Sequence, residues 1–260
     1  MAITAAMVKE LRELSGAGMM DCKKALNETN GNMDEAIEFL RKNGQAKAEK
    51  KASRIAAEGI VKVAVKDNVA AIVEVNSETD FVAKNEKFQT YVGKVAEQAL
   101  ATEAADMDAF LEEAWLEDTS KTVKDVLVEQ VAVIGENLKI RRFEKAAAQN
   151  GCIVDYIHGG GRIGVVVVAE SSIVNDTVKE AMKNIAMQIA ALNPKYIDRS
   201  EVSAEYIAHE KEILLAQIQN DPKESQKPEK VINGMIEGRV NKELKEICLV
   251  DQVYVKAEDG

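Results

Sequence analysis

The chain has 260 residues, and 46% of them are hydrophobic, which is enough for one large domain or two to three small ones. Its formal net charge of -10 argues against nucleic acid as the main partner, because contact with phosphates requires a surplus of Lys and Arg. The three cysteines, Cys22, Cys152 and Cys248, fit neither a disulfide framework nor a metal site. We therefore expect no metal, no cofactor and a reducing, cytoplasmic location. The sequence shows neither a signal peptide nor a run approaching the ~18 apolar residues of a membrane span, so no membrane association is expected.

Residues 1–44 predict three short helices. Thr4 is a candidate N-cap for the first helix, and Gly16 ends it. The third helix is expected to stop at Asn43-Gly44, a favourable left-handed cap. We interpret this segment as a small three-helix module, followed by a helical linker over residues 45–56.

The next segment, residues 57–147, begins with a predicted β-hairpin. Apolar residues alternate on both sides of Asp67-Asn68, a turn dipeptide, and the second strand reaches Val75. Three helices and a strand are expected after it, at about 80–101, 106–116, 121–135 and 138–143. These elements form the predicted N-terminal half of the core.

A second hairpin is predicted around Gly159-Gly160-Gly161, with strands over 152–158 and 162–169. The glycines favour a hairpin turn over an anion-binding loop, because no helix follows them directly. An amphipathic helix comes next and stops at Asn193-Pro194. The order hairpin-then-helix thus occurs twice, which indicates two related α+β halves.

Two long helices are predicted between residues 201 and 245. A polar loop with Pro222 and Pro228 joins them, so we expect an antiparallel helical hairpin, or coiled coil, inserted into the second half. The C-terminal half of the core then comprises residues 148–200 and 246–260, with a further strand at 252–256. The predicted fold class is α+β.

The most informative run extends from Glu74 to Lys84, where a strand breaks into polar residues. Thr79 could cap a helix whose first turn holds Asp80 and Phe81. Phe81 is then either a core residue or a protruding wedge. Its helical spacing with Phe88 favours the core.

The whole run from Glu74 to Lys84 resembles the signature of bacterial elongation factor Ts, the family that drives GDP off elongation factor Tu. Residues 11–26 and 135–142 also resemble this family, with Ser15 where the family usually has Thr. The resemblance implies that residues 1–44 form a ubiquitin-associated-like (UBA-like) module. It also implies a nucleotide-release wedge at the corner, made of Thr79, Asp80, Phe81 and Val82. The Phe81 ring would enter between two helices of elongation factor Tu near its Mg²⁺ site.

Further partner contacts follow from the same resemblance. They are Arg12, Met19, Met20, Lys23, His158, Met235 and Ile236. From the residues alone, one of the adjacent methionines could belong to a core, and His158 could be an ordinary loop residue. Ile236 could equally belong to an ordinary apolar stripe.

The resemblance implies a guanine-nucleotide exchange factor and not an enzyme. Its partner would be elongation factor Tu, both GDP-bound and nucleotide-free. Family members commonly continue beyond the position of Gly260, so the second core and a homodimer that depends on it are left open. Two alternatives stand beside this interpretation. One is a UBA-like docking protein without exchange activity, and the other is a small-molecule enzyme that uses Arg162 and His158 on an anion.

Overall fold

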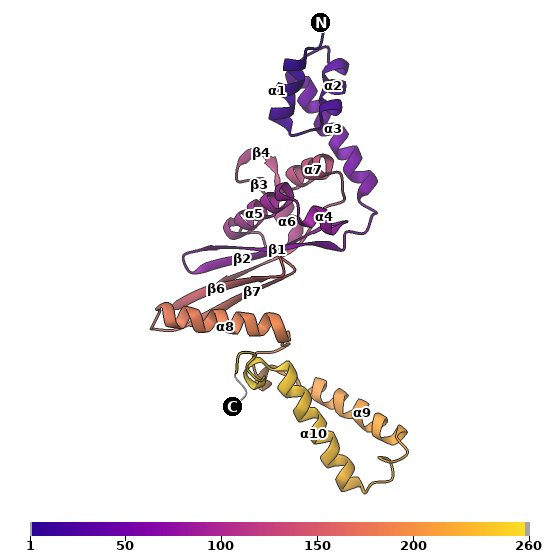
Figure 1. The fold of residues 1–260 in the computed structure, drawn as a ribbon, viewed down its shortest axis with the longest axis vertical. Helices are drawn as coiled ribbons and strands as arrows, with labels where there is room; N and C mark the ends of the chain where they lie inside the picture. The colour runs from indigo at the N-terminus through magenta and orange to yellow at the C-terminus, as the bar shows by residue number, and fades with distance from the viewer. Residues whose placement is uncertain (1, 258–260) are drawn as a thin grey trace. The chain divides into compact units, whose positions relative to one another are not determined.

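The computed structural model describes residues 2–257 and has a mixed α+β architecture (Figure 1). The chain divides into two compact units, one up to Lys179 and the other from Glu180 onwards. The first unit contains an N-terminal helical region and the small antiparallel sheets. The second unit is helical.

Three helices open the first unit: α1 (Ala5–Ser15), α2 (Met19–Glu28) and α3 (Met33–Lys51). Thr4 caps α1 as predicted, and its hydroxyl accepts a hydrogen bond from the N–H of Met7 at 3.3 Å. The helices enclose a small core whose fully buried members are Leu11, Cys22, Ala25, Leu26 and Ala36. The predicted number of helices in this segment, three, is confirmed.

The prediction that the third helix ends at Asn43-Gly44 is wrong, because α3 continues to Lys51. Gly44 is buried against α7 (Val123–Ile134), and a Cβ built on it would lie 3.5 Å from the Cβ of Ala132. The glycine is therefore a site of close helix packing and not a helix end. A cap at this position cannot be distinguished from a packing contact by sequence alone.

A three-stranded antiparallel sheet forms the centre of the first unit. Its strands are β1 (Glu58–Lys66), β2 (Val69–Ser77) and β5 (Lys139–Ala147), in the order β1-β2-β5. The predicted turn at Asp67-Asn68 is present, with Asp67 at a φ of 54° and Lys66 paired with Val69. The central strand β2 is the most buried, as expected for a strand with neighbours on both sides.

Helices cover one face of this sheet (Figure 1). They are the short α4 (Asp80–Ala83), α5 (Glu86–Ala101) and α6 (Met107–Glu112), and α7 packs against α6 and α3. Helix α5 packs on β1 and β2 and supplies the fully buried Phe88, Val92 and Val95. Two short strands, β3 (Ala114–Trp115) and β4 (Asp118–Thr122), pair between α6 and α7.

Two of the predicted helices differ from the expectation: one is divided in two, and the other ends early. The helix expected at about 80–101 is divided between α4 and α5, because Asn85 caps α5 by accepting from the N–H of Lys87. The helix expected at 106–116 ends at Glu112. There the side chain of Gln98 donates to the carbonyl of Ala114 and accepts from the N–H of Leu116, which takes this backbone into a strand.

The second hairpin consists of β6 (Gly151–His158) and β7 (Ile163–Glu170) and lies on the other face of the three-stranded sheet (Figure 1). Its turn is fixed to β1 by a hydrogen bond from the N–H of Val61 to the carbonyl of Gly161, at 2.7 Å. A Cβ on Gly161 would come within 2.8 Å of the Cβ of Ile60, and its φ is 101°. Only glycine fits there, so the predicted turn also serves as a packing contact.

The second unit contains α8 (Asp176–Leu192) from Glu180 onwards and the long helices α9 (Ala204–Asn220) and α10 (Glu229–Ile247). It also contains the 3₁₀ turns η1 (Arg199–Glu201) and η2 (Leu249–Asp251). Helices α9 and α10 pack together as the predicted pair, joined by a loop. Their shared core is built from Val202, Ile218, Ile236, Val240, Leu244 and Cys248.

The strand predicted at 252–256 is wrong. Gln188 on α8 donates to the carbonyl of Val253 at 3.0 Å and accepts from the N–H of Val255 at 2.8 Å. A side chain, and not a neighbouring strand, thus pairs with this backbone. The alternation of Val253 and Val255 gave a false strand pattern.

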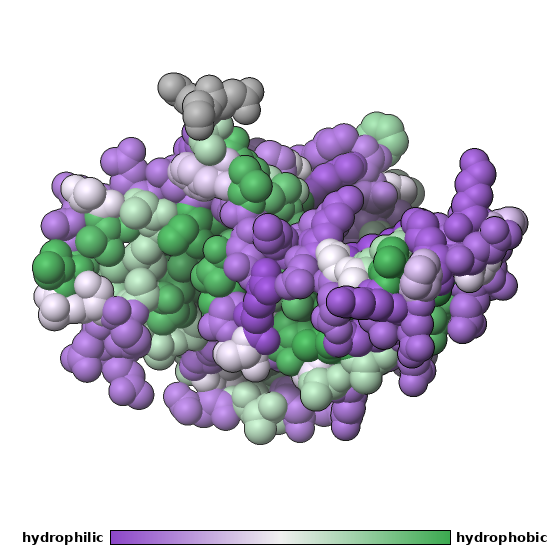
Figure 2. All heavy atoms as spheres, turned by 90° about the horizontal axis from the view of Figure 1, so that it is seen from below, coloured by the Kyte–Doolittle hydropathy of each residue, from purple (hydrophilic) through white to green (hydrophobic). Residues whose placement is uncertain are grey.

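The surface seen from below is a mosaic of green hydrophobic patches among purple hydrophilic ones (Figure 2). Several large apolar residues of the second unit are exposed: Leu192, Ile197, Val250, Val253 and Tyr254. Within residues 2–257, no helix combines the length and apolarity that a membrane span requires.

Candidate partner-binding site

The corner between β2 and α4 is a short junction held by hydrogen bonds. Strand β2 ends at Ser77, which is fully buried, and Thr79 is the N-cap of α4. The hydroxyl of Ser77 donates to the carbonyl of Thr79 at 3.1 Å, and the hydroxyl of Thr79 accepts from the N–H of Val82 at 3.4 Å. The polar run that interrupts the strand therefore makes the turn.

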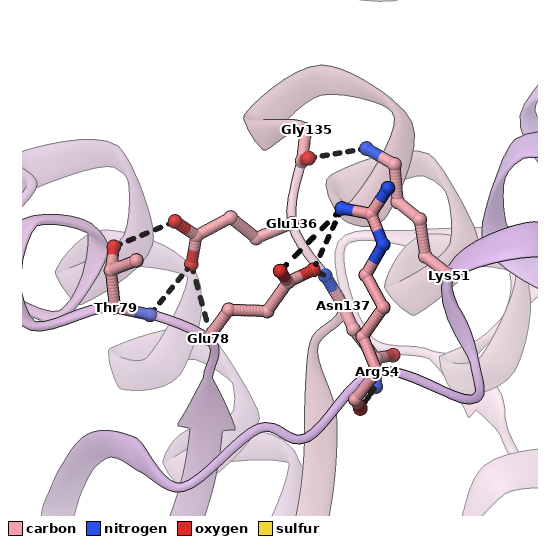
Figure 3. Close-up of polar contacts among 7 residues, drawn as sticks. All are labelled: Lys51, Arg54, Glu78, Thr79, Gly135, Glu136 and Asn137. Atoms are coloured by element: carbon pink, nitrogen blue, oxygen red, sulfur yellow. Dashed lines mark hydrogen bonds and ion pairs between the residues drawn. The ribbon is translucent and has the colours of Figure 1, made fainter.

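Two carboxylates connect this corner to the loop after α7 (Figure 3). The carboxylate of each segment accepts hydrogen bonds from the other segment. Glu136 accepts from the N–H groups of Glu78 and Thr79, both at 3.0 Å, and from the hydroxyl of Thr79 at 2.6 Å. In the opposite direction, Glu78 accepts from the N–H of Asn137 at 2.6 Å. Arg54 completes the arrangement with a contact to Glu78 at 3.4 Å.

Phe81 projects from the corner with 81% of its surface exposed. The expectation from helical spacing that it belongs to the core is therefore wrong. Its neighbour Val82 packs against the core of the unit and holds α4 down. Asp80 forms an exposed ion pair with Lys84 at 2.7 Å. This hydrogen bond from Lys84 lowers the pKa of the Asp80 carboxyl, and the charge of Arg162 adds to the effect.

The candidate residues of the N-terminal helices are all exposed. Met19 and Met20 begin α2 with 59% and 74% of their surfaces exposed, so neither methionine belongs to the core. Arg12 on α1 and Lys23 on α2 are exposed as well. Leu14, near the end of α1, is also exposed, and it was not among the partner contacts expected from the sequence. An apolar residue two positions before Gly16, where the helix ends, is the sequence feature that could have indicated it.

His158 ends β6 on the exposed turn of the second hairpin. Its Nδ1 lies 2.9 Å from the hydroxyl of Tyr156, and the two rings are 5.9 Å apart between centroids. This pair and the Gly159–Gly161 turn belong to the same unit as the Phe81 corner.

Met235 and Ile236 lie on α10 in the second unit. Ile236 is only 7% exposed and belongs to the core shared with α9. Met235 is half-buried and packs against the same core. The geometry thus favours the ordinary apolar stripe for this pair, most clearly for Ile236.

The small-molecule alternative requires Arg162 and His158 on one anion, but the residues that line the hollow beside β1 include Arg162 and not His158. Tyr156 contacts His158, and the hollow is lined by Arg162, Arg142 and Glu74. Glu74 is already paired with Arg142 at 2.7 Å. Among residues 2–257, no group of three or more His, Cys, Asp or Glu side chains is placed to hold a metal ion.

The fold and the site together describe a mixed α+β protein with exposed apolar side chains at fixed corners, an arrangement typical of a protein that binds another protein. Comparison with known proteins makes this specific. The family model described as elongation factor TS matches residues 78–260.

Three relatives named elongation factor Ts align with 99% of the chain. The protein of Clostridioides difficile (strain 630) is 52% identical over 259 residues, which are 83% of the relative. Those of Clostridium tetani (strain Massachusetts / E88) and Clostridium novyi (strain NT) are each 49% identical, over 84% and 83% of the relative. The chain belongs to the elongation factor Ts family, and it is therefore an elongation factor of protein synthesis.

Proposed function

We propose that this chain is a guanine-nucleotide exchange factor. It binds elongation factor Tu in complex with GDP and promotes GDP release during translation elongation by disturbing the Mg²⁺ and phosphate site of its partner. In this role it makes and breaks no covalent bond, so it is not an enzyme in the chemical sense.

The observation that carries the proposal is the exposed Phe81 on a fixed corner. Burial of a large aromatic side chain is favourable, so an 81% exposed ring on a structured element has a reason to find a partner surface. Thr79, Asp80 and Val82 support it: the first caps α4, the second is ion-paired and the third is anchored in the core. A ring held in this way can be inserted into a partner without first being ordered.

The thermodynamic basis is linkage between the two ligands of elongation factor Tu. If this chain weakens the affinity of elongation factor Tu for GDP, then GDP weakens the affinity for this chain by the same factor. A coupling free energy of about 3 kcal/mol corresponds to a change of about 150-fold. Because Mg²⁺ requires near-octahedral coordination, small displacements by the Phe81 ring are enough to weaken its binding.

Other parts of the chain would provide docking. We infer a UBA-like module at residues 1–44, with Arg12, Met19, Met20 and Lys23 as partner contacts, and His158 as a contact from the second hairpin. The exposure of these five side chains supports this assignment. The burial of Ile236 removes it from the proposed surface, and Met235 has only weak support.

We also propose the division of the remaining chain into a linker, two related core halves and an inserted helical hairpin. The supporting observation is the order of elements: β1 and β2 are followed by α4 and α5, and β6 and β7 are followed by α8. The pair α9 and α10 then interrupts the second half.

The second candidate function is docking without exchange, and exposure of Met19 and Met20 would serve it equally well. The test is the release of a fluorescent GDP analogue from purified elongation factor Tu, with and without catalytic amounts of this chain. Release that accelerates and saturates with the concentration of the chain supports exchange. Binding without acceleration supports docking alone.

A further inference from the structure

We propose that Glu136 is a positioning residue for nucleotide release: its carboxylate holds the Thr79–Phe81 corner in the geometry that presents the Phe81 ring. The inference rests on the proposed exchange function and assigns a role to a residue that does not itself need to contact the partner. It follows from the hydrogen bonds between two segments almost sixty residues apart in sequence, as Figure 3 shows.

Phe81 is not held by packing of its own ring. Its ring is 81% exposed, and α4 spans only Asp80–Ala83. A helix this short has little stability of its own, because forming the first turn is unfavourable. The direction of the ring is therefore set by what holds α4: the packing of Val82 on the core and the hydrogen bonds of the neighbouring backbone.

From outside the corner, Glu136 supplies the hydrogen bonds to the backbone of Glu78 and Thr79. Three donors converge on its carboxylate, namely the N–H groups of Glu78 and Thr79 and the Thr79 hydroxyl, at 3.0, 3.0 and 2.6 Å. Hydrogen bonds to an ionised acceptor are about twice as strong as neutral ones. The same Thr79 hydroxyl accepts from Val82, so Glu136 acts on α4 through the cap residue.

Glu136 is itself held in place by its neighbours in the chain. It follows Gly135, which ends α7 with a φ of 89° and whose carbonyl accepts from Lys51. The next residue, Asn137, donates its N–H to Glu78 and its side-chain amide to the carbonyl of Arg54. The corner and the 135–137 loop therefore brace each other, and the end of α3 braces the loop.

The test uses Glu136→Gln, which keeps the size of the side chain but removes its charge and replaces one acceptor with a donor. Glu113→Gln is the matched control. Glu113 is also half-buried and also accepts from a threonine hydroxyl, that of Thr102, at 2.6 Å, but it lies away from the corner.

The first measurement is amide hydrogen exchange of the full chain. The Glu78 and Thr79 amides should exchange about fivefold faster in Glu136→Gln, since a neutral amide oxygen accepts about half as strongly as a carboxylate. The Val73 amide inside β2 should be unchanged, and Glu113→Gln should leave all three amides as they are. Unaltered Glu78 and Thr79 amides in Glu136→Gln would overturn the inference.

The second measurement is GDP release from elongation factor Tu in a double-mutant cycle with Phe81→Ala. If Glu136 acts through the ring, Glu136→Gln lowers the maximal release rate about tenfold, changes the affinity for elongation factor Tu less than about twofold, and has no further effect when Phe81 is already Ala. Additive losses, or a loss equal to that of Glu113→Gln, would show a purely structural role and contradict the inference.

The two proposals fail in different ways. A wild-type chain that does not accelerate GDP release would overturn the proposed function and the exchange part of this inference. The amide measurement would still decide whether Glu136 holds the corner. Faster amides without a loss of release rate in an active chain would overturn only the positioning role.

Discussion

Phe81 and Phe88 are seven residues apart, yet Phe88 is fully buried and Phe81 is 81% exposed. Seven residues are two helical turns, so both rings would share one face of a continuous helix. The break at Asn85, between α4 and α5, separates them. The corner thus presents one phenylalanine to the outside while the other anchors α5 to the sheet.

This difference predicts opposite effects on stability. Phe88→Ala should lower the free energy of unfolding of the first unit by about 3–5 kcal/mol, because it leaves a cavity in the core. Phe81→Ala should change it by less than about 0.5 kcal/mol, as is usual for exposed positions. Urea unfolding followed by circular dichroism measures both. A large destabilisation by Phe81→Ala would mean that its ring packs in solution.

The turn of the second hairpin offers a matched pair of glycines. Gly161→Ala should destabilise the first unit by about 2 kcal/mol or more, since the new Cβ would meet Ile60 at 2.8 Å and the φ of 101° is unfavourable for alanine. Gly160→Ala, with a φ of 69° and open space around it, should lower stability by only about 1 kcal/mol. Thermal unfolding of the two variants compares them, and equal effects would show that the turn does not pack closely on β1.

Two tyrosines test the value of a hydrogen bond. The hydroxyl of Tyr91 is buried in the first unit without a partner among residues 2–257, whereas the hydroxyl of Tyr206 donates to Glu243 at 2.6 Å. Tyr91→Phe should be neutral or stabilising by up to about 1 kcal/mol, because a buried polar atom without a partner is unfavourable. Tyr206→Phe should destabilise by about 1 kcal/mol. Chemical unfolding of each variant gives the values, and a clear loss for Tyr91→Phe would reveal a partner such as an ordered water.

Acid stability should depend on Asp125 at the start of α7. The N–H of Thr122 donates to its carboxylate at 3.0 Å, and this bond lowers the pKa of Asp125 below its ordinary value of 3.8. A carboxyl with a lowered folded-state pKa stabilises the fold above the unfolded-state value, and this contribution is lost as the pH falls below it. Asp125→Asn should therefore be less stable than wild type at pH 7, with the two stabilities converging below about pH 4. Unfolding measured across this range that gives parallel curves would contradict the assignment.

Local signals in the sequence were sufficient for much of the fold. Thr4, the Asp67-Asn68 turn and Asn193-Pro194 act on backbone within a few residues of themselves, so each predicted an element boundary correctly. The alternating strands of both hairpins and the pair α9 and α10 were predicted correctly for the same reason.

The errors arose where a distant residue decides the local structure. Gly44 continues its helix because Ala132 is packed against it, and Val253 forms no strand because Gln188 bonds its carbonyl. At the candidate site the exposed methionines and Phe81 could be selected from motifs. Glu136 could not be given a role, because its three donors come from a segment almost sixty residues earlier.

The most direct test of the central claim compares wild type and Phe81→Ala in GDP release and in binding. The account predicts that Phe81→Ala loses most of the acceleration of GDP release from elongation factor Tu, while binding to nucleotide-free elongation factor Tu stays measurable by calorimetry. That split follows if the ring acts on the nucleotide site and Met19, Met20 and His158 provide docking. Equal losses of binding and release, or release at the wild-type rate, would contradict the wedge.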